Sequence, residues 1–158
     1  MSITSRQANY RIYPGQFDLF ALVEDDPQTF PALLQSTAQS LNQQSTTARY
    51  DILFCYPRQT LCKDSSGRVM LDDRILQTDS FLATLDEVWR NQRSESALPA
   101  TLPFRGGWLV YLGYELAGEI EPVLDLPRSP DTLPVAMAMR IGAAVIYDHE
   151  QQLSLIHI

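Results

Sequence analysis

Two glutamates, Glu115 and Glu119, have the spacing that could most readily support acid–base chemistry. They lie in a segment that predicts a short helix, and a separation of four residues places both carboxylates on one helix face. Two neighbouring carboxyl groups can act as general acid and general base. Exposed helix faces carry the same spacing far more often, so we expect these side chains to be solvated rather than catalytic.

Two histidines and two cysteines are the other candidates for chemistry. His149 lies in a polar stretch that predicts a hairpin turn, where we expect an exposed imidazole, and His157 lies close behind it. Cys55 and Cys62 match no zinc or redox spacing. We expect two reduced, buried thiols on neighbouring strands, and a disulfide between them stays open. The common motifs of serine hydrolases, zinc proteases and phosphate-binding loops do not occur, so no familiar active site is predicted.

The composition is that of a chain that folds around a core. The 158 residues include 45% hydrophobic residues, which excludes a disordered chain and suits one domain. The formal net charge of −7 argues against a dedicated nucleic-acid-binding protein, whose affinity depends on Lys and Arg. The longest uncharged apolar stretch has nine residues, against about 18 for a membrane span, and there is no signal-peptide pattern. We therefore expect a cytoplasmic protein.

The first half of the sequence predicts short strands separated by turns. An alternating segment ends at a Pro14-Gly15 turn, and residues 17–23 suit either a strand or a helical turn. Residues 37–47 are uncharged and polar and predict a surface loop. The predicted strands are residues 30–36, residues 50–56 ending at Pro57, and a hairpin of residues 60–62 and 68–71.

The second half predicts a helix and then longer strands. Ser80 is a candidate N-cap for a helix to about Arg93, with apolar residues at helical spacing and a charged, solvated opposite face. The elements expected after it are a buried strand (106–114), a short helix (115–121), an extended loop (124–134), a long strand (135–147), a turn (148–152) and a final strand. Together they predict an α+β fold, mainly antiparallel sheet with one or two packed helices.

One stretch of the sequence resembles a known family. Residues 102–121 read LPFRGGWLVYLGYELAGEIE, a strand with Gly-Gly followed by Gly-Tyr-Glu opening a helix. This is similar to the N-terminal domain of the chorismate-utilising amination enzymes, anthranilate synthase component I and aminodeoxychorismate synthase component I. Leu-Leu-Gln-Ser at 33–36 and Arg-Tyr-Asp-Ile-Leu at 49–53 agree in order and spacing, so the resemblance covers residues 17–153.

Within this family, the details favour the aminodeoxychorismate branch. The anthranilate branch usually has Leu-Leu-Glu-Ser followed by Arg-Tyr-Ser, where this chain has Gln35 and Asp51. The resemblance then implies a full-length enzyme that aminates chorismate to 4-amino-4-deoxychorismate, for 4-aminobenzoate and folate synthesis. It implies Mg²⁺ as cofactor and a separate glutamine amidotransferase subunit as the source of ammonia. Anthranilate synthase component I and a free-standing tryptophan-binding regulatory module stay as alternatives.

The resemblance also implies a tryptophan half-site. Family members bind tryptophan between strands of this domain and the domain that follows. The matching positions are Leu34, Ser36, Arg49, Tyr50 and Asp51. The Ser36 hydroxyl could exchange a hydrogen bond with the amino or carboxylate group of the ligand. Ordinary packing and capping at strand ends accounts for the same residues equally well.

Glycines have structural roles in the motif region. We expect Gly106 and Gly107 to permit close packing or a bulge at a strand start, and Gly113 to turn the strand into the helix opened by Tyr114 and Glu115.

The boundaries follow from the resemblance as well. Residues 1–152 are expected to be a truncated N-terminal domain that is inactive alone, because the family binds chorismate and magnesium in a C-terminal domain. We expect neither a catalytic residue nor a metal ligand within it. Residues 153–158, Leu-Ser-Leu-Ile-His-Ile, suit either a native strand or the translation of an adapter used in library preparation.

Overall fold

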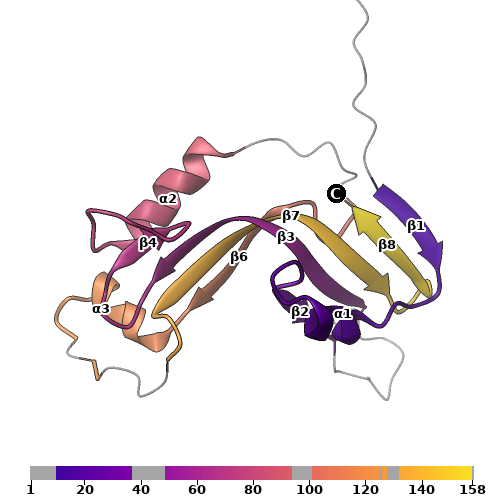
Figure 1. Cartoon of the computed structure of the whole chain (residues 1–158), viewed down its shortest axis with the longest axis horizontal. Helices are drawn as coiled ribbons and strands as arrows, with labels where there is room; N and C mark the ends of the chain where they lie inside the picture. Colours follow the sequence, from indigo (N-terminus) through magenta and orange to yellow (C-terminus); the bar gives the residue numbers. More distant parts are fainter. Residues whose placement is uncertain (1–9, 37–48, 94–100, 125, 128–131, 158) are drawn as a thin grey trace, which may run out of the picture. The chain divides into compact units, whose positions relative to one another are not determined.

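An antiparallel sheet with short helices makes up the computed structural model of this chain. The structure describes residues 10–36, 49–93, 101–124, 126–127 and 132–157. Within these ranges the strand order is β1-β8-β7-β3-β4-β5, with β2 pairing with β3 and β6 with β7 (Figure 1). The predicted α+β class is confirmed. The predicted loop at 37–47 lies outside the described residues.

The chain divides into two compact units. Unit 1 comprises residues 1–57, 96–107 and 141–158, and unit 2 comprises residues 58–95 and 108–140. Two long strands, β3 (Tyr50–Lys63) and β7 (Ala136–Asp148), contribute residues to both. Among the described residues, no helix combines the length and apolar character that a membrane crossing requires.

Unit 1 begins with β1 (Tyr10–Pro14), which pairs antiparallel with β8 (Leu153–His157). β8 in turn pairs with β7. Helix α1 (Leu19–Asp25) follows. The Asp18 carboxylate caps its first turn by accepting a hydrogen bond from the Ala21 N–H, 3.0 Å away. The segment 17–23, which suited either a strand or a helical turn, therefore contains the start of a helix. Strand β2 (Ala32–Leu34) then pairs with the first part of β3.

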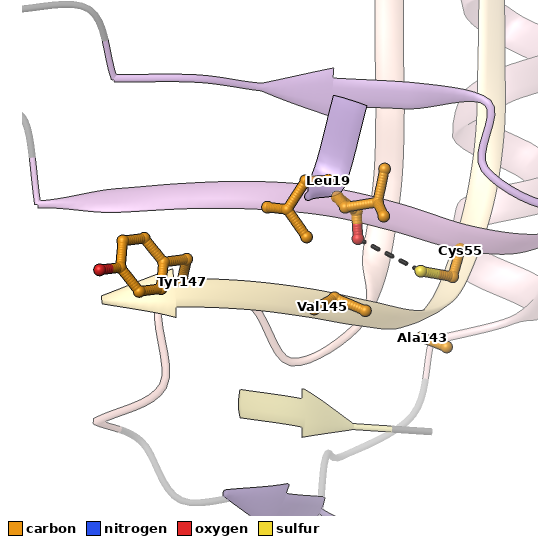
Figure 2. Close-up of a cluster of buried hydrophobic side chains, with 6 residues drawn as sticks. Leu19, Cys55, Ala143, Val145 and Tyr147 are labelled. Carbon is orange, nitrogen blue, oxygen red and sulfur yellow. Dashed lines mark hydrogen bonds between the residues drawn. The ribbon is translucent and has the colours of Figure 1, made fainter. Parts of the chain in front are cut away.

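The core of unit 1 lies between α1 and the strands β3 and β7 (Figure 2). Its buried members are Leu19, Leu53, Cys55, Ala143, Val145 and Tyr147. The intervening β7 residues Ala144 and Ile146 belong to a second cluster, together with Leu155. Successive side chains of a strand point to opposite faces, so β7 contributes to an apolar core on each face.

Unit 2 contains the predicted hairpin and the predicted main helix. The end of β3 pairs with β4 (Val69–Leu71), with Leu61 opposite Leu71. β4 pairs with β5 (Arg74–Ile75), a strand that sequence analysis missed. The connecting Asp72 and Asp73 both have positive φ, 48° and 65°, as a two-residue hairpin turn requires, and Asp tolerates this conformation better than most residues.

Helix α2 (Phe81–Asn91) begins at the predicted cap. The Ser80 hydroxyl accepts a hydrogen bond from the Ala83 N–H at 3.1 Å. Phe81 is fully buried against a core that also contains Leu61, Val69, Leu116, Ala136 and Ala138. Trp89, at the far end of the predicted apolar stripe, is 43% exposed.

The prediction that a strand ends at Pro57 is wrong. β3 continues to Lys63, and the positive φ of 53° at Tyr56 indicates a local bulge rather than an end. Proline lacks a backbone N–H and is tolerated at such a bulge. Cys55 and Cys62 are therefore free thiols on the same strand, not on neighbouring strands as predicted.

The prediction of a buried strand at 106–114 is also wrong in part. Strand β6 (Gly107–Leu112) exists, but Val110, Tyr111 and Leu112 are 41–52% exposed. Among the described residues β6 pairs only with β7, so its other edge has no neighbouring strand. The 3₁₀-helix η2 (Tyr114–Leu116) and helix α3 (Ala117–Ile120) follow, close to the predicted short helix.

Candidate functional site

The proposed half-site residues gather where β2 ends and β3 begins. Antiparallel pairing places Leu34 opposite Ile52, which brings Ser36 next to the first residues of β3. The Ser36 N–H donates to Asp51 Oδ1 at 2.8 Å, and the Ser36 hydroxyl donates to the Tyr50 carbonyl at 2.8 Å. Leu34 itself is 52% exposed. The structure therefore joins Ser36, Tyr50 and Asp51 by hydrogen bonds, with Leu34 on the adjacent strand.

Arg49, just before β3, is bound to two carboxylates of the same chain. Two nitrogens of its guanidinium make three hydrogen bonds to Asp148, with Nε 3.1 Å from both carboxylate oxygens and Nη2 2.7 Å from Oδ2. Glu150 Oε2 lies 3.1 Å from Nη1, and the guanidinium also lies over the Tyr50 ring, 4.9 Å from its centroid. The hydrogen bonds that Arg49 donates to Asp148 raise the pKa of Arg49. The charge of Arg49 is thus already matched within the chain.

The partner carboxylate, Asp148, lies at the end of β7. Burial alone would raise its pKa, but the hydrogen bonds from Arg49 and from the N–H groups of Glu150 and Gln151 outweigh it, and the pKa is lowered. Those two N–H groups donate to Oδ1 at 2.9 and 3.1 Å and form the predicted turn. Sequence analysis did not select Asp148, although the Tyr-Asp-His sequence at 147–149 lay within the resemblance.

His149 differs from its predicted role as an exposed turn residue. Its Nε2 lies 3.0 Å from Asp51 Oδ1, and its side chain is 36% exposed. The ring contacts Tyr147 edge-on, with centroids 4.8 Å apart, and the backbone N–H donates to the Arg49 carbonyl at 2.8 Å. Pairing of β7 with β8 turns the chain at this residue, as predicted, and long-range contacts partly cover a side chain that its local sequence indicates as exposed.

A cavity of about 370 Å³ lies beside Asp51. Its lining residues are Gln16, Phe17, Asp18, Leu19, Phe20, Gln35 and Asp51. This volume falls in the range of small-molecule sites, and the lining combines two carboxylates, two amides and two aromatic rings. Such a lining suits a ligand with an ammonium group and an apolar or aromatic part.

The glutamate pair does not form a catalytic site, and the predicted solvated face is wrong for Glu119. Its side chain is 13% exposed and lies 2.7 Å from the Lys63 ammonium. It accepts hydrogen bonds from the Ser80 hydroxyl and from the N–H groups of Phe81 and Leu82, at 2.8–3.0 Å. Burial would raise the pKa of Glu119, but these bonds together lower it. The contact joins residues 38 positions apart in sequence, which local periodicity cannot reveal.

The motif glycines lie at both ends of β6. Gly106 and Gly107 have φ of 95° and 152°, a region that side chains disfavour. At Gly113 there is no room for a side chain, because a Cβ would lie 2.7 Å from the Val135 carbonyl oxygen. That oxygen accepts the Gly113 N–H, also at 2.7 Å. Tyr114 follows with 85% of its surface exposed, and Glu115 is half-buried.

No metal site is formed by the residues that the structure describes. Nowhere among them do three or more His, Cys, Asp or Glu side chains gather in a way that could hold an ion. Cofactor binding by the longer protein remains a prediction from the resemblance.

Comparison with known proteins gives relatives of one kind, although no family model matches. The chain is 29% identical to "Anthranilate synthase component 1" of Geobacillus stearothermophilus, over 94% of this chain and 30% of that protein. It is 36% identical over 74 residues to "Anthranilate synthase component I-like protein" of Synechocystis sp., which covers 47% of this chain and 15% of the relative.

A solved structure has the same fold. Anthranilate synthase component I from Streptococcus pneumoniae TIGR4 matches 77% of this chain with a TM-score of 0.55 and 20% sequence identity, over 27% of its own length. The chain is thus similar in sequence to two proteins, and in fold to a third, that are named for anthranilate synthase component I. The chain spans less than a third of the length of each of these relatives.

Proposed function

We propose that this chain is the N-terminal, non-catalytic part of an enzyme that aminates chorismate. The observation that carries this proposal is the similarity to anthranilate synthase component 1 over 94% of the chain. The described residues fit a supporting role, because their buried carboxylates serve structural contacts. Asp148 binds Arg49, and Glu119 caps α2 and binds Lys63.

Two products are candidates for the full-length enzyme. We propose 4-amino-4-deoxychorismate, because Asp51 follows Arg49 and Tyr50 where the anthranilate branch usually has Ser. Anthranilate is the second candidate, since both sequence relatives are named for anthranilate synthase. In either case we propose Mg²⁺ as cofactor, a glutamine amidotransferase as the partner that supplies ammonia, and a cytoplasmic location.

The site beside Asp51 is proposed to form half of a tryptophan site. The Asp51 carboxylate would pair with the ligand ammonium, and Phe17 and Phe20 would pack against its ring. The Ser36 hydroxyl donates to the Tyr50 carbonyl, so towards a ligand it can only accept a hydrogen bond. Arg49 would act by positioning Tyr50, because its own charge is bound by Asp148 and Glu150.

Product analysis tests the proposal. The longest reading frame that contains this chain would be expressed and incubated with chorismate, ammonium and Mg²⁺. Anthranilate is detected by its fluorescence, and 4-amino-4-deoxychorismate is detected as 4-aminobenzoate after an added lyase. We expect 4-aminobenzoate, with no turnover by the 158-residue chain alone. Formation of anthranilate alone would select the second candidate, and absence of both products would overturn the proposal.

A further inference from the structure

The turn between β7 and β8 is tied to the start of β3 at three places. The His149 N–H donates to the Arg49 carbonyl at 2.8 Å, and the Arg49 guanidinium binds Asp148. The third contact is between two titratable side chains, His149 Nε2 and Asp51 Oδ1, which lie 3.0 Å apart. Segments about a hundred residues apart in sequence therefore meet at a contact whose strength depends on one proton.

The chemistry of this contact changes with the protonation of the imidazole. His149 Nε2 is shielded from solvent and makes no well-aligned hydrogen bond in the structure. A neutral imidazole can offer this carboxylate at most a single uncharged N–H, or a lone pair that the carboxylate repels. A protonated imidazole carries hydrogens on both nitrogens and forms an ion pair with Asp51 at the same distance.

Charged side chains from both segments lie at this corner of unit 1. From β3 and the residue before it, Asp51 and Arg49 face the turn, and from β7 and the turn itself come Asp148 and Glu150. Asp148 and Glu150 pair with Arg49, and Asp51 is the carboxylate next to the His149 ring. Tyr147 contacts the His149 ring edge-on.

Asp51 connects His149 to the end of β2 through its contact with Ser36. Asp51 is 3% exposed. Its Oδ1, the oxygen that faces His149, also accepts the Ser36 N–H. Fixing this carboxylate fixes the end of β2 as well. An Asn at position 51 could still accept the Ser36 N–H but would lack the charge.

We propose that protonation of His149 closes a latch between the β7–β8 turn and the Ser36–Asp51 pair. The latch holds this corner of unit 1 more tightly in mildly acidic solution than at pH 8. It goes beyond the proposed function, and its test uses neither chorismate nor tryptophan.

Melting temperatures of four forms of the 158-residue chain test the latch. These are the wild type, His149→Gln, Asp51→Asn and the double variant, each at pH 5.5 and pH 8. We expect His149→Gln to lower the melting temperature by several degrees more at pH 5.5 than at pH 8, and this difference to vanish in the Asp51→Asn background. The other histidine, His157, is present in all four forms and cancels in each comparison at one pH.

Two results would overturn the latch. One is an effect of His149→Gln that is the same at both pH values, and the other is a pH-dependent effect that persists in the Asp51→Asn background. Hydrogen exchange gives a second readout that does not need the Asp51 variant to fold. We expect His149→Gln to reduce the protection of the Ser36 amide severalfold at pH 5.5 but not at pH 8, with the Gly113 amide of unit 2 unchanged. Equal protection in the two forms at pH 5.5 would refute the proposal.

Discussion

The Glu119 carboxylate of α3 lies 2.8 Å from the Ser80 hydroxyl at the start of α2. It also accepts two backbone N–H groups in the first turn of α2, which no intrahelical carbonyl can satisfy. Ser80 caps the helix locally, and Glu119 adds a negative charge at its positive end. A contact between distant segments thus completes a helix cap that the sequence showed only in part.

Replacing Glu119→Gln should destabilise unit 2. Gln retains the size of the side chain but loses the charge that faces Lys63 and the start of α2, so we expect a loss of about 1–3 kcal/mol. Urea unfolding at pH 7 measures it. Glu121→Gln, at a nearby exposed position, is the control and should change stability by less than about 0.5 kcal/mol. Equal stability of the two variants would contradict the assigned role.

The effect of Glu119→Gln should depend on pH. The folded-state pKa of Glu119 lies below its ordinary value of 4.5, so its contribution to stability is present above that value. As the pH falls through the lowered pKa, the folded protein binds the proton and the contribution is lost. The stabilities of the wild type and the variant should therefore approach each other as the pH falls below 4.5. If the stability difference between the wild type and Glu119→Gln stayed constant down to pH 3, an electrostatic origin of that difference would be excluded.

Asp148→Asn should weaken unit 1 more than Glu150→Gln. Asp148 has 7% side-chain exposure and binds Arg49 through three short donor–acceptor contacts, whereas Glu150 is 56% exposed. We expect a loss of about 1–3 kcal/mol for Asp148→Asn and less than about 0.5 kcal/mol for Glu150→Gln. Because the pKa of Asp148 is lowered, the loss should be full at pH 7 and decline below about pH 4. Thermal unfolding at several pH values measures both losses. A larger loss for Glu150→Gln than for Asp148→Asn would contradict the structural role of Asp148.

Cys55 should be nearly inert in the folded chain. Burial raises the pKa of its thiol to about 11, so at pH 8 only about one thiol in a thousand is ionised. Burial also raises the pKa of Cys62, which is only partly buried. We expect iodoacetamide at pH 8 to modify Cys62 before Cys55, and denaturant to make both react at similar rates. Mass spectrometry of the digested protein separates the two sites, and faster labelling of Cys55 would contradict its place in the core.

Local signals in the sequence predicted much of the fold. The Ser80 cap, the 60–71 hairpin and the turn after Asp148 depend on residues close together in the chain, and the structure has all three. Glu119 was assigned wrongly and the contact of His149 with Asp51 was missed, because the partners, Ser80 and Asp51, are 39 and 98 positions away in the sequence. Strand pairing creates such contacts, and periodicity carries no information on them. The half-site residues were found through the resemblance, not through a local pattern.

Tryptophan binding tests the proposed half-site. Part of the contacts would come from a following domain, and a loss of about 3 kcal/mol weakens binding more than a hundredfold, so the isolated chain should bind no better than millimolar. In the longer enzyme, Ser36→Ala should weaken binding by about 1–2 kcal/mol, partly through loss of the bond to the Tyr50 carbonyl. Ser65→Ala, at an exposed position, is the control. Calorimetry that gave micromolar affinity for the isolated chain would exclude a shared site.

The central proposal is that this chain is the N-terminal, non-catalytic part of an enzyme that aminates chorismate. The direct test is a chimera in which the chain replaces the aligned segment of the Geobacillus stearothermophilus enzyme, assayed for anthranilate formation from chorismate, ammonium and Mg²⁺. We predict measurable anthranilate formation by the chimera and none by the same enzyme lacking the segment. A chimera that unfolds cooperatively on heating but forms no anthranilate would contradict the claim.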